Sequence, residues 1–340
     1  MRIAVLGTGA IGSCVGADLT RAGHDVLLID QWPAHVGAMR AGGLAVTMPT
    51  GRDETRVRAV DLCEMKALQP SFDIVFLTAK SYDTPWMVEF VKPYLKPTGV
   101  LVSVQNSLND EWIAPVIGYE RDIGCVIELS AELYEPGQVK RNTDREQTWF
   151  ALGELHGRVT PRVQEIARIL GASGRTGVTQ NIWGAKWTKL TVNSMSQAVA
   201  GVLGMFEGEI PDHPRLLELC IRLGQEALQV GAALGYCVEP IFGLGPEAFL
   251  GTAGEVLETS LKTLLSHIGR RSRNSTLQDH LKGRKSEIDF LNGLVVKKGR
   301  EAGVRTPLNE AMVALTRQIE HKDLRPDPRN LPILERLLER

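Results

Sequence analysis

Residues 1–12 read MRIAVLGTGAIG, and this stretch decides the fold of the chain. The apolar run Ile3 to Leu6 predicts a short buried strand that ends directly at a glycine-spaced turn. In such a turn Gly7 makes the tight bend, Gly9 lets the backbone approach a pyrophosphate, and Gly12 lets the next helix lie close on the strand. The stretch therefore predicts a dinucleotide site at a helix N-terminus, where unpaired N–H groups favour a phosphate.

The residues after the turn continue the pattern. Residues 11, 15 and 19 are apolar at helical spacing, and a second apolar strand over 26–29 ends at Asp30. A carboxylate at that position can accept hydrogen bonds from both hydroxyls of an adenine ribose. We expect cofactor contacts from Asp30 and from every residue of the turn: Gly7, Thr8, Gly9, Ala10, Ile11 and Gly12. A glycine-rich turn without nucleotide is the alternative interpretation, and the ordered strand–helix–strand context disfavours it.

Composition restricts the class of protein. The chain has 340 residues, enough for two domains, and a formal net charge of -1 that gives no reason to expect nucleic acid or an anionic membrane. Its 5 cysteines are scattered without a C-x-x-C pair, which argues against a metal site and fits a reducing cytoplasm. No apolar run approaches the roughly 20 residues of a membrane span. We therefore expect a cytoplasmic protein that binds small molecules and no metal.

Strand-like and helix-like segments alternate in the first half. Strands are predicted over 73–78 and 100–104 with a helix between them, which indicates a doubly wound, mainly parallel sheet. Hairpin-like segments over 125–152 predict antiparallel strands that extend the edge of this sheet. The second half is predicted to be helical over 182–203, 215–234, 254–268, 285–302 and 308–321. The fold class is thus α/β, with a Rossmann-type domain over residues 1–180 and an all-helical substrate and catalytic domain over 181–340.

The predicted helix 182–203 carries a stripe of polar residues. Lys189, Asn193 and Gln197 follow one another at intervals of four, so they share one face of a helix that is otherwise largely apolar. In a partly desolvated cleft between the domains, burial would lower the pKa of a lysine and make it a usable proton donor. Amides beside it can orient a carbonyl or a carboxylate. The alternative, a lysine extending to solvent and amides that link helices, stays open from spacing alone.

Polar residues also follow two strands of the predicted sheet. Lys80 comes just after the strand that ends at residue 78, and Asn106 just after the strand that ends at residue 104. Parallel α/β sheets bind ligands at the carboxyl ends of their strands, so we expect both residues in one crevice.

Ser275 and Glu287 form a third group, a hydroxyl in a loop or cap and an acid in the first turn of a predicted helix. Ser286 with Asp289 also fits a capping-box-like helix start, in which Glu287 merely favours the helix dipole.

Taken together, these motifs resemble the ketopantoate reductase (2-dehydropantoate 2-reductase) family from residue 1 to about residue 315. The matching motifs are GTGAIG at 7–12, T-x-K at 78–80, Gln105 with Asn106, W-x-K-L-x-x-N at 187–193, and S-x-L-Q-D with S-E-I-D-x-x-N-G across 275–293. The resemblance implies a Rossmann domain followed by a helical domain similar to the C-terminal domain of 6-phosphogluconate dehydrogenase. It also implies NAD(P)H-dependent reduction of a branched 2-oxo acid, 2-dehydropantoate to pantoate, a step of pantothenate biosynthesis.

The same resemblance implies roles for the candidate residues. Lys189 would donate the proton to the substrate carbonyl oxygen, and Glu287 would lie beside this lysine and the cofactor. Lys80 and Asn106 would contact the cofactor. The substrate-binding residues would be Asn106, Asn193, Gln197 and Ser275.

Three positions depart from the family pattern. Ser107 stands where the family has glycine. Gln197 stands where the family has asparagine, and its extra methylene shifts the side-chain amide, which bears on the identity of the substrate. Asp30 replaces a basic or neutral polar residue and favours NAD(H), whereas the resemblance favours NADP(H). A related 2- or 3-hydroxy acid dehydrogenase and a non-catalytic dinucleotide-binding protein therefore stay as alternatives. Analogy with related folds adds a homodimer to the expectations.

Overall fold

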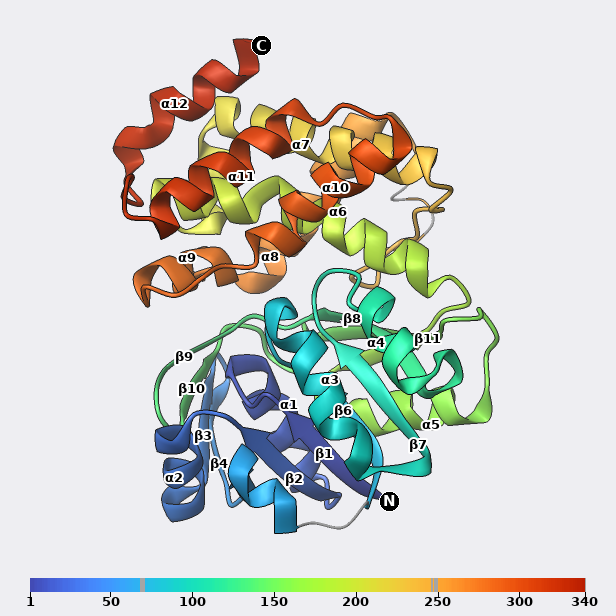
Figure 1. Cartoon of the computed structure of the whole chain (residues 1–340). Helices are drawn as coiled ribbons and strands as arrows, with labels where there is room; N and C mark the ends of the chain where they lie inside the picture. Colours follow the sequence, from blue (N-terminus) through green and yellow to red (C-terminus); the bar gives the residue numbers. More distant parts are fainter. Residues whose placement is uncertain (68–70, 246, 248–249, 340) are drawn as a thin grey trace. The chain divides into compact units, whose positions relative to one another are not determined.

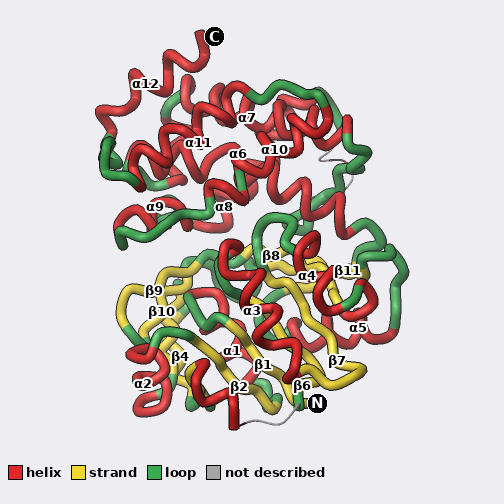
Figure 2. The backbone as a smooth tube through the Cα atoms, viewed as in Figure 1, coloured by secondary structure: helices red, strands yellow, loops and turns green. Residues whose placement is uncertain are grey.

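The computed structural model describes residues 1–67, 71–245, 247 and 250–339 (Figure 1). The chain divides into two compact units, Met1–Trp183 and Gly184–Arg340. In Figure 2 the first unit combines strands and helices, and the second is drawn as helices and loops.

The first unit is built on an eight-stranded sheet in the order β12-β11-β8-β7-β6-β1-β2-β5. Its strands are β1 (Arg2–Leu6), β2 (Asp25–Asp30), β5 (Ala59–Asp61), β6 (Phe72–Leu77), β7 (Leu95–Val104), β8 (Asp122–Glu128), β11 (Trp149–Glu154) and β12 (Arg175–Val178). The run β5-β2-β1-β6-β7-β8 is parallel and has the Rossmann order, with its switch point between β1 and β6. The predicted doubly wound sheet is confirmed.

The sheet is buried on both faces, as its continuous apolar strands require. In β1, Ile3 and Val5 belong to one apolar core and Ala4 and Leu6 to the other, because successive side chains point to opposite faces. The accompanying helices are α1 (Ala10–Arg21), α2 (Pro33–Gly42), α3 (Thr84–Val91), α4 (Asp110–Ile117) and α5 (Pro161–Leu170).

The predicted hairpin does not extend the edge of this sheet. It forms β9 (Ala131–Glu135) and β10 (Gln138–Arg141), which join β3 (Leu44–Met48) and β4 (Gly51–Thr55) in a separate sheet of order β4-β3-β10-β9. Among the described strands, β11 alone extends the main sheet in antiparallel pairing, with β8. The separate sheet forms because β10 pairs in parallel with β3 and its Arg141 is completely buried against Asp18 of α1.

The second unit contains α6 (Ile182–Leu203, which starts two residues before the boundary), α7 (Pro214–Ala233), α8 (Ala253–Ile268), α9 (Ser275–Leu281), α10 (Asn292–Ala302), α11 (Pro307–Glu320) and α12 (Leu331–Glu335). All regular secondary structure assigned to its described residues is helical, as predicted. Helices α6 and α7 approach closely, because a Cβ on Gly231 would lie 2.1 Å from Nε1 of Trp187. No helix in the described part of the chain has the length and apolar character needed to cross a membrane.

The helix expected over 285–302 is shorter. It begins at Asn292, after a 3-10 turn over Ile288–Phe290. The capping-box interpretation is wrong, because Ser286 Oγ donates to Glu320 at 2.6 Å and Asp289 accepts from Arg317 at 2.6 Å. Tertiary partners on α11 therefore hold both side chains away from a helix start.

Candidate active site

The glycine turn between β1 and α1 has three different local environments. Gly7 has a φ of +86°, which glycine adopts without strain, and a Cβ there would lie 2.9 Å from the backbone of Ala79. A Cβ on Gly12 would meet Thr78 Oγ1 at 2.4 Å, whereas a Cβ on Gly9 would meet no described atom within 4 Å. Gly9 is also the N-cap of α1, and no side chain caps this helix. The turn thus leaves its backbone accessible at Gly9, where a phosphate can approach the helix N-terminus.

Asp30 lies at the end of β2 with its carboxylate directed back to the turn. It is 7% exposed and accepts hydrogen bonds from Thr8 Oγ1 at 3.1 Å and from the Trp32 N–H at 2.8 Å. The two donors reach different carboxylate oxygens. Because an ionised carboxylate has about four acceptor positions, roughly two remain for ligand hydroxyls.

A buried histidine supports the turn from α2. The N–H of Gly137 donates to Nδ1 of His35 at 3.0 Å, so the ring proton is on Nε2, which donates to Ser13 Oγ at 3.1 Å. Ser13 Oγ in turn donates to the carbonyl of Thr8 at 2.8 Å. Burial lowers the pKa of His35, and the nearby Asp30 carboxylate partly opposes this effect. His35 was not predicted from the sequence, because a single histidine in a helix carries no spacing signal.

The loops after β6 and β7 lie together at one edge of the sheet. These strands pair in parallel with Leu77 opposite Ser103, which brings the segments of Lys80 and Asn106 to the same end. Gln105 Nε2 joins the two loops by donating to the carbonyl of Ala79 at 2.7 Å. Thr78 Oγ1 donates to the Gly7 carbonyl at 2.7 Å, which attaches this edge to the glycine turn.

Ser107 has a φ of +75°, a left-handed conformation that is unusual for a residue other than glycine. Its neighbouring loop is held by Asn109, whose Nδ2 donates to the carbonyl of Asn106 at 2.8 Å and to Ser81 Oγ at 3.1 Å. This left-handed φ explains why glycine suits this position in the family pattern.

In the second unit the structure joins Ser275 to the polar stripe of α6. Lys189, Asn193 and Gln197 are all buried, with exposed fractions of 7%, 1% and 8%. Ser275 begins α9 and donates from Oγ to Gln197 Oε1 at 2.9 Å. Asn274, the N-cap of α9, also donates to the Gln197 carbonyl at 3.3 Å. The low exposure of Lys189 contradicts the alternative of a lysine extending to solvent, whereas the contacts of Gln197 with α9 agree with its second part, amides that link helices.

Glu287 is buried immediately before the 3-10 turn, and its carbonyl accepts from the N–H groups of Phe290 at 2.9 Å and Leu291 at 3.0 Å. Its backbone is therefore fixed at the start of the segment that leads into α10.

Two residues near Lys189 were not predicted. The ring of Phe242 is centred 4.7 Å from Lys189 Nζ, and Phe242 is buried with a φ of +63°, a strained conformation for an aromatic residue. Glu207 is buried and accepts a hydrogen bond from Ser196 Oγ of α6. Burial raises the pKa of Glu207, and the Ser196 hydrogen bond and the Lys189 charge partly oppose this effect. Neither residue belongs to a periodic pattern, so no spacing signal could have revealed them.

The Rossmann order and the accessible glycine turn define a protein of the dinucleotide-binding class. Two family profiles match the chain, "Ketopantoate reductase PanE/ApbA" over residues 3–155 and "Ketopantoate reductase PanE/ApbA C terminal" over residues 181–320. The chain belongs to the ketopantoate reductase family.

Individual relatives span nearly the whole chain. A 2-dehydropantoate 2-reductase of Pyrococcus horikoshii is 31% identical over 327 residues, covering 94% of this chain and 98% of the relative. The crystal structure of a PanE/ApbA family ketopantoate reductase from Ralstonia eutropha JMP134 is 27% identical and has a TM-score of 0.78. The match covers 95% of this chain and 99% of that structure. The structure of a D-mandelate dehydrogenase with NADH and anilino(oxo)acetate has a TM-score of 0.82 and is 23% identical, covering 95% of this chain and 99% of that chain. This similarity shows a shared fold.

Proposed function

We propose that this chain catalyses the NAD(P)H-dependent reduction of 2-dehydropantoate to pantoate. The observation that carries the proposal is the buried stripe of Lys189, Asn193 and Gln197, to which Ser275 is hydrogen-bonded. An ammonium, two amides and a hydroxyl on one buried face suit a small ligand that carries a carboxylate and a carbonyl. The names of the family relatives support the same reaction. In this proposal residues 1–180 bind the dinucleotide, and residues 181–340 supply the substrate contacts and the proton.

Lys189 is the proposed proton donor. Its ammonium donates a hydrogen bond to the C2 carbonyl oxygen of the 2-oxo acid, and the Nζ proton transfers as negative charge develops on that oxygen. Asn193 and Ser275 hold the substrate in the orientation that exposes C2 to hydride, which is a proximity effect. Gln197, whose Oε1 accepts from Ser275 Oγ, is the remaining proposed substrate-binding residue of this helix. Loss of the proton leaves neutral Lys189, which regains a proton from solvent.

The first unit has groups that fit a dinucleotide. Accessible backbone at Gly9 and the uncapped N-terminus of α1 suit the pyrophosphate. We assign Lys80 and Asn106 to the nicotinamide half, with Asn106 also contacting the substrate, and Glu287 to a position beside Lys189 and the cofactor. When bound, the reduced nicotinamide supplies the hydride.

We also propose that the cofactor is NAD(H). Asp30 has acceptor capacity for two ribose hydroxyls, and its negative charge would repel the 2′-phosphate of NADP(H).

All five cysteines are free thiols, which is consistent with the proposed cytoplasmic location. We also propose a homodimer, by analogy with related folds.

The decisive experiment measures steady-state reduction of ketopantoate and a panel of 2-oxo acids with NADH and NADPH. Lys189→Met is expected to lower kcat by about 100-fold or more while leaving the Kd for the nucleotide unchanged. Lys297→Met, an exposed lysine of α10, is the matched control and keeps wild-type kcat. Near-full turnover of Lys189→Met would refute the assigned proton donor. Nucleotide binding without turnover on any acid would favour the non-catalytic alternative, and preferred oxidation of a hydroxy acid would favour the related dehydrogenase.

A further inference from the structure

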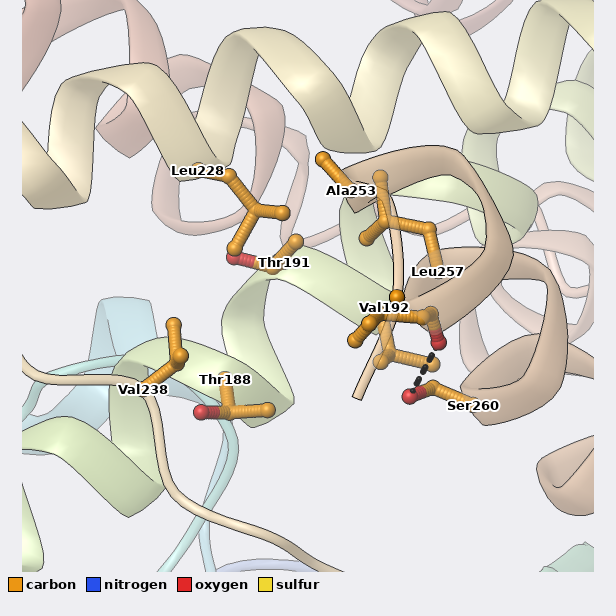
Figure 3. Close-up of a pocket in the computed structure, with 10 residues that line it drawn as sticks. Thr188, Thr191, Val192, Leu228, Val238, Ala253, Leu257 and Ser260 are labelled. Atoms are coloured by element: carbon orange, nitrogen blue, oxygen red, sulfur yellow. Dashed lines mark hydrogen bonds between the residues drawn. The ribbon is translucent and has the colours of Figure 1, made fainter. Parts of the chain in front are cut away.

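A hollow of about 210 Å³ lies between helices α6, α7 and α8 of the helical unit. Figure 3 shows that aliphatic side chains such as Val192, Leu228 and Leu257 form much of its wall. The hydroxyls of Thr188 and Ser260 donate to backbone carbonyls of their own helices, so the wall carries little that would select a ligand. A more specific group, an exposed indole, lies in the first unit beside the glycine turn.

Trp32 places a large aromatic side chain just after the end of β2. It is the N-cap of α2 and is 39% exposed. Its N–H donates to Asp30 Oδ1 at 2.8 Å, which fixes its backbone beside the carboxylate that is assigned to the ribose hydroxyls. Isolated aromatic residues are common on protein surfaces, so exposure by itself assigns no role to Trp32. The contacts of its ring supply the second observation.

The ring of Trp32 is held by a stack on His35, with the two ring centroids 5.6 Å apart and the planes 25° from parallel. His35 is itself fixed, because Nδ1 accepts from the Gly137 N–H at 3.0 Å and Nε2 donates to Ser13 Oγ at 3.1 Å. Ser13 Oγ donates to the carbonyl of Thr8 in the glycine turn. The indole is therefore preorganised next to the turn, and a flat ligand that stacks on it would cost little conformational entropy. Since His35 covers one face of the indole, such a ligand can stack only on the other face.

We infer that Trp32 stacks on the adenine ring of the bound dinucleotide. The inference rests on the dinucleotide site proposed for the glycine turn and Asp30. In NAD(H) the adenine is attached directly to the ribose whose hydroxyls would bind Asp30, so the base lies within reach of a side chain two residues further along the chain. An indole suits a purine, because stacking of aromatic faces needs no particular pattern of hydrogen bonds. Trp32 is therefore a binding residue for the adenine half of the cofactor and takes no part in hydride transfer.

ADP-ribose is a suitable probe, because it carries the adenine, its ribose and the pyrophosphate but no nicotinamide. Isothermal titration calorimetry of the full-length protein measures its Kd without any turnover. Trp32→Leu keeps an apolar cover over His35 and removes the aromatic face, so we expect the Kd for ADP-ribose to rise about tenfold. Trp32→Phe restores an aromatic face and should stay within about threefold of the wild type. Trp86→Leu is the matched control and should keep the wild-type Kd, because Trp86 of α3 is 38% exposed in the same unit.

Reduced nicotinamide mononucleotide, which lacks the adenine half, separates stacking from support of the glycine turn. Its affinity, measured by ligand-observed NMR titration, should change less than about twofold in Trp32→Leu. Equal weakening of both probes would overturn the inference, since it would show that Trp32 acts on the turn through His35. An unchanged Kd for ADP-ribose in Trp32→Leu, an equal rise in Trp86→Leu, or no binding of ADP-ribose by the wild type would contradict it as well. A Trp32-dependent Kd for ADP-ribose without reduction of any 2-oxo acid would support the inference and refute the proposed reaction instead.

Discussion

Asp30→Asn tests the cofactor assignment most directly. The substitution keeps the size of the side chain and one acceptor oxygen, and the new amide can still interact with Thr8 Oγ1. It removes the negative charge and one carboxylate oxygen from the position where the ribose hydroxyls are expected. Because the side-chain volume is unchanged, any change in nucleotide selectivity reports on the charge and the acceptor capacity of Asp30.

The expected magnitude follows from the contacts of Asp30. With one protein donor on each oxygen, the carboxylate can accept one ribose hydroxyl per oxygen. A hydrogen bond to a charged group contributes about 1.5 kcal/mol or more, so loss of one should lower kcat/KM for NADH about tenfold. A 2′-phosphate about 4 Å from a carboxylate is repelled by roughly 4 kcal/mol per charge at an effective dielectric constant near 20. Relief of even half of this repulsion raises kcat/KM for NADPH by about 30-fold.

The assay compares kcat/KM for NADH and NADPH at saturating 2-oxo acid. We expect the NADH-to-NADPH ratio to fall by at least about 100-fold in Asp30→Asn. Asp25→Asn is the matched control, because Asp25 lies at the other, exposed end of β2 and pairs with Arg58. An unchanged ratio in Asp30→Asn, or an equal change in Asp25→Asn, would refute the role assigned to Asp30.

Three further predictions concern charges within the units. Arg141→Met removes four hydrogen bonds, one of them to Asp18, and leaves that buried carboxylate with less compensation. The free energy of unfolding in urea should fall by about 3–5 kcal/mol, whereas a smaller loss would show that Arg145 compensates. Phe242→Leu removes the ring that favours the Lys189 ammonium, so the alkaline limb of the kcat–pH profile should move about one unit to lower pH; an unshifted limb would contradict this. Because the folded-state pKa of His35 is lowered, the folded protein binds fewer protons than the unfolded chain below pH 6.5. Stability should therefore decrease as the pH falls through this window, and His35→Gln should reduce that slope.

The sequence predicted those features that local spacing controls. The glycine turn, the alternating strands and the long helix α6 all follow from the periodicity of apolar residues. Features that depend on distant partners were not predictable in this way. The hairpin β9–β10 pairs with β3, nearly a hundred residues earlier, and the start of α10 is displaced by partners on α11. His35 contacts Gly137 across a separation of 102 residues, so no local pattern could reveal it.

The surroundings of Lys189 include two groups that favour its charged form. The sequence alone predicts that burial lowers the pKa of Lys189, which disfavours its ammonium form. A proton donor must nevertheless be protonated when substrate binds. The structure adds the face of the Phe242 ring at 4.7 Å and the Glu207 carboxyl, whose pKa the Lys189 charge lowers against the effect of burial. The ring favours the ammonium in either protonation state of Glu207, and an ionised Glu207 favours it further. Lys189 can therefore be both desolvated and protonated, which is the combination that proton donation to a developing alkoxide requires.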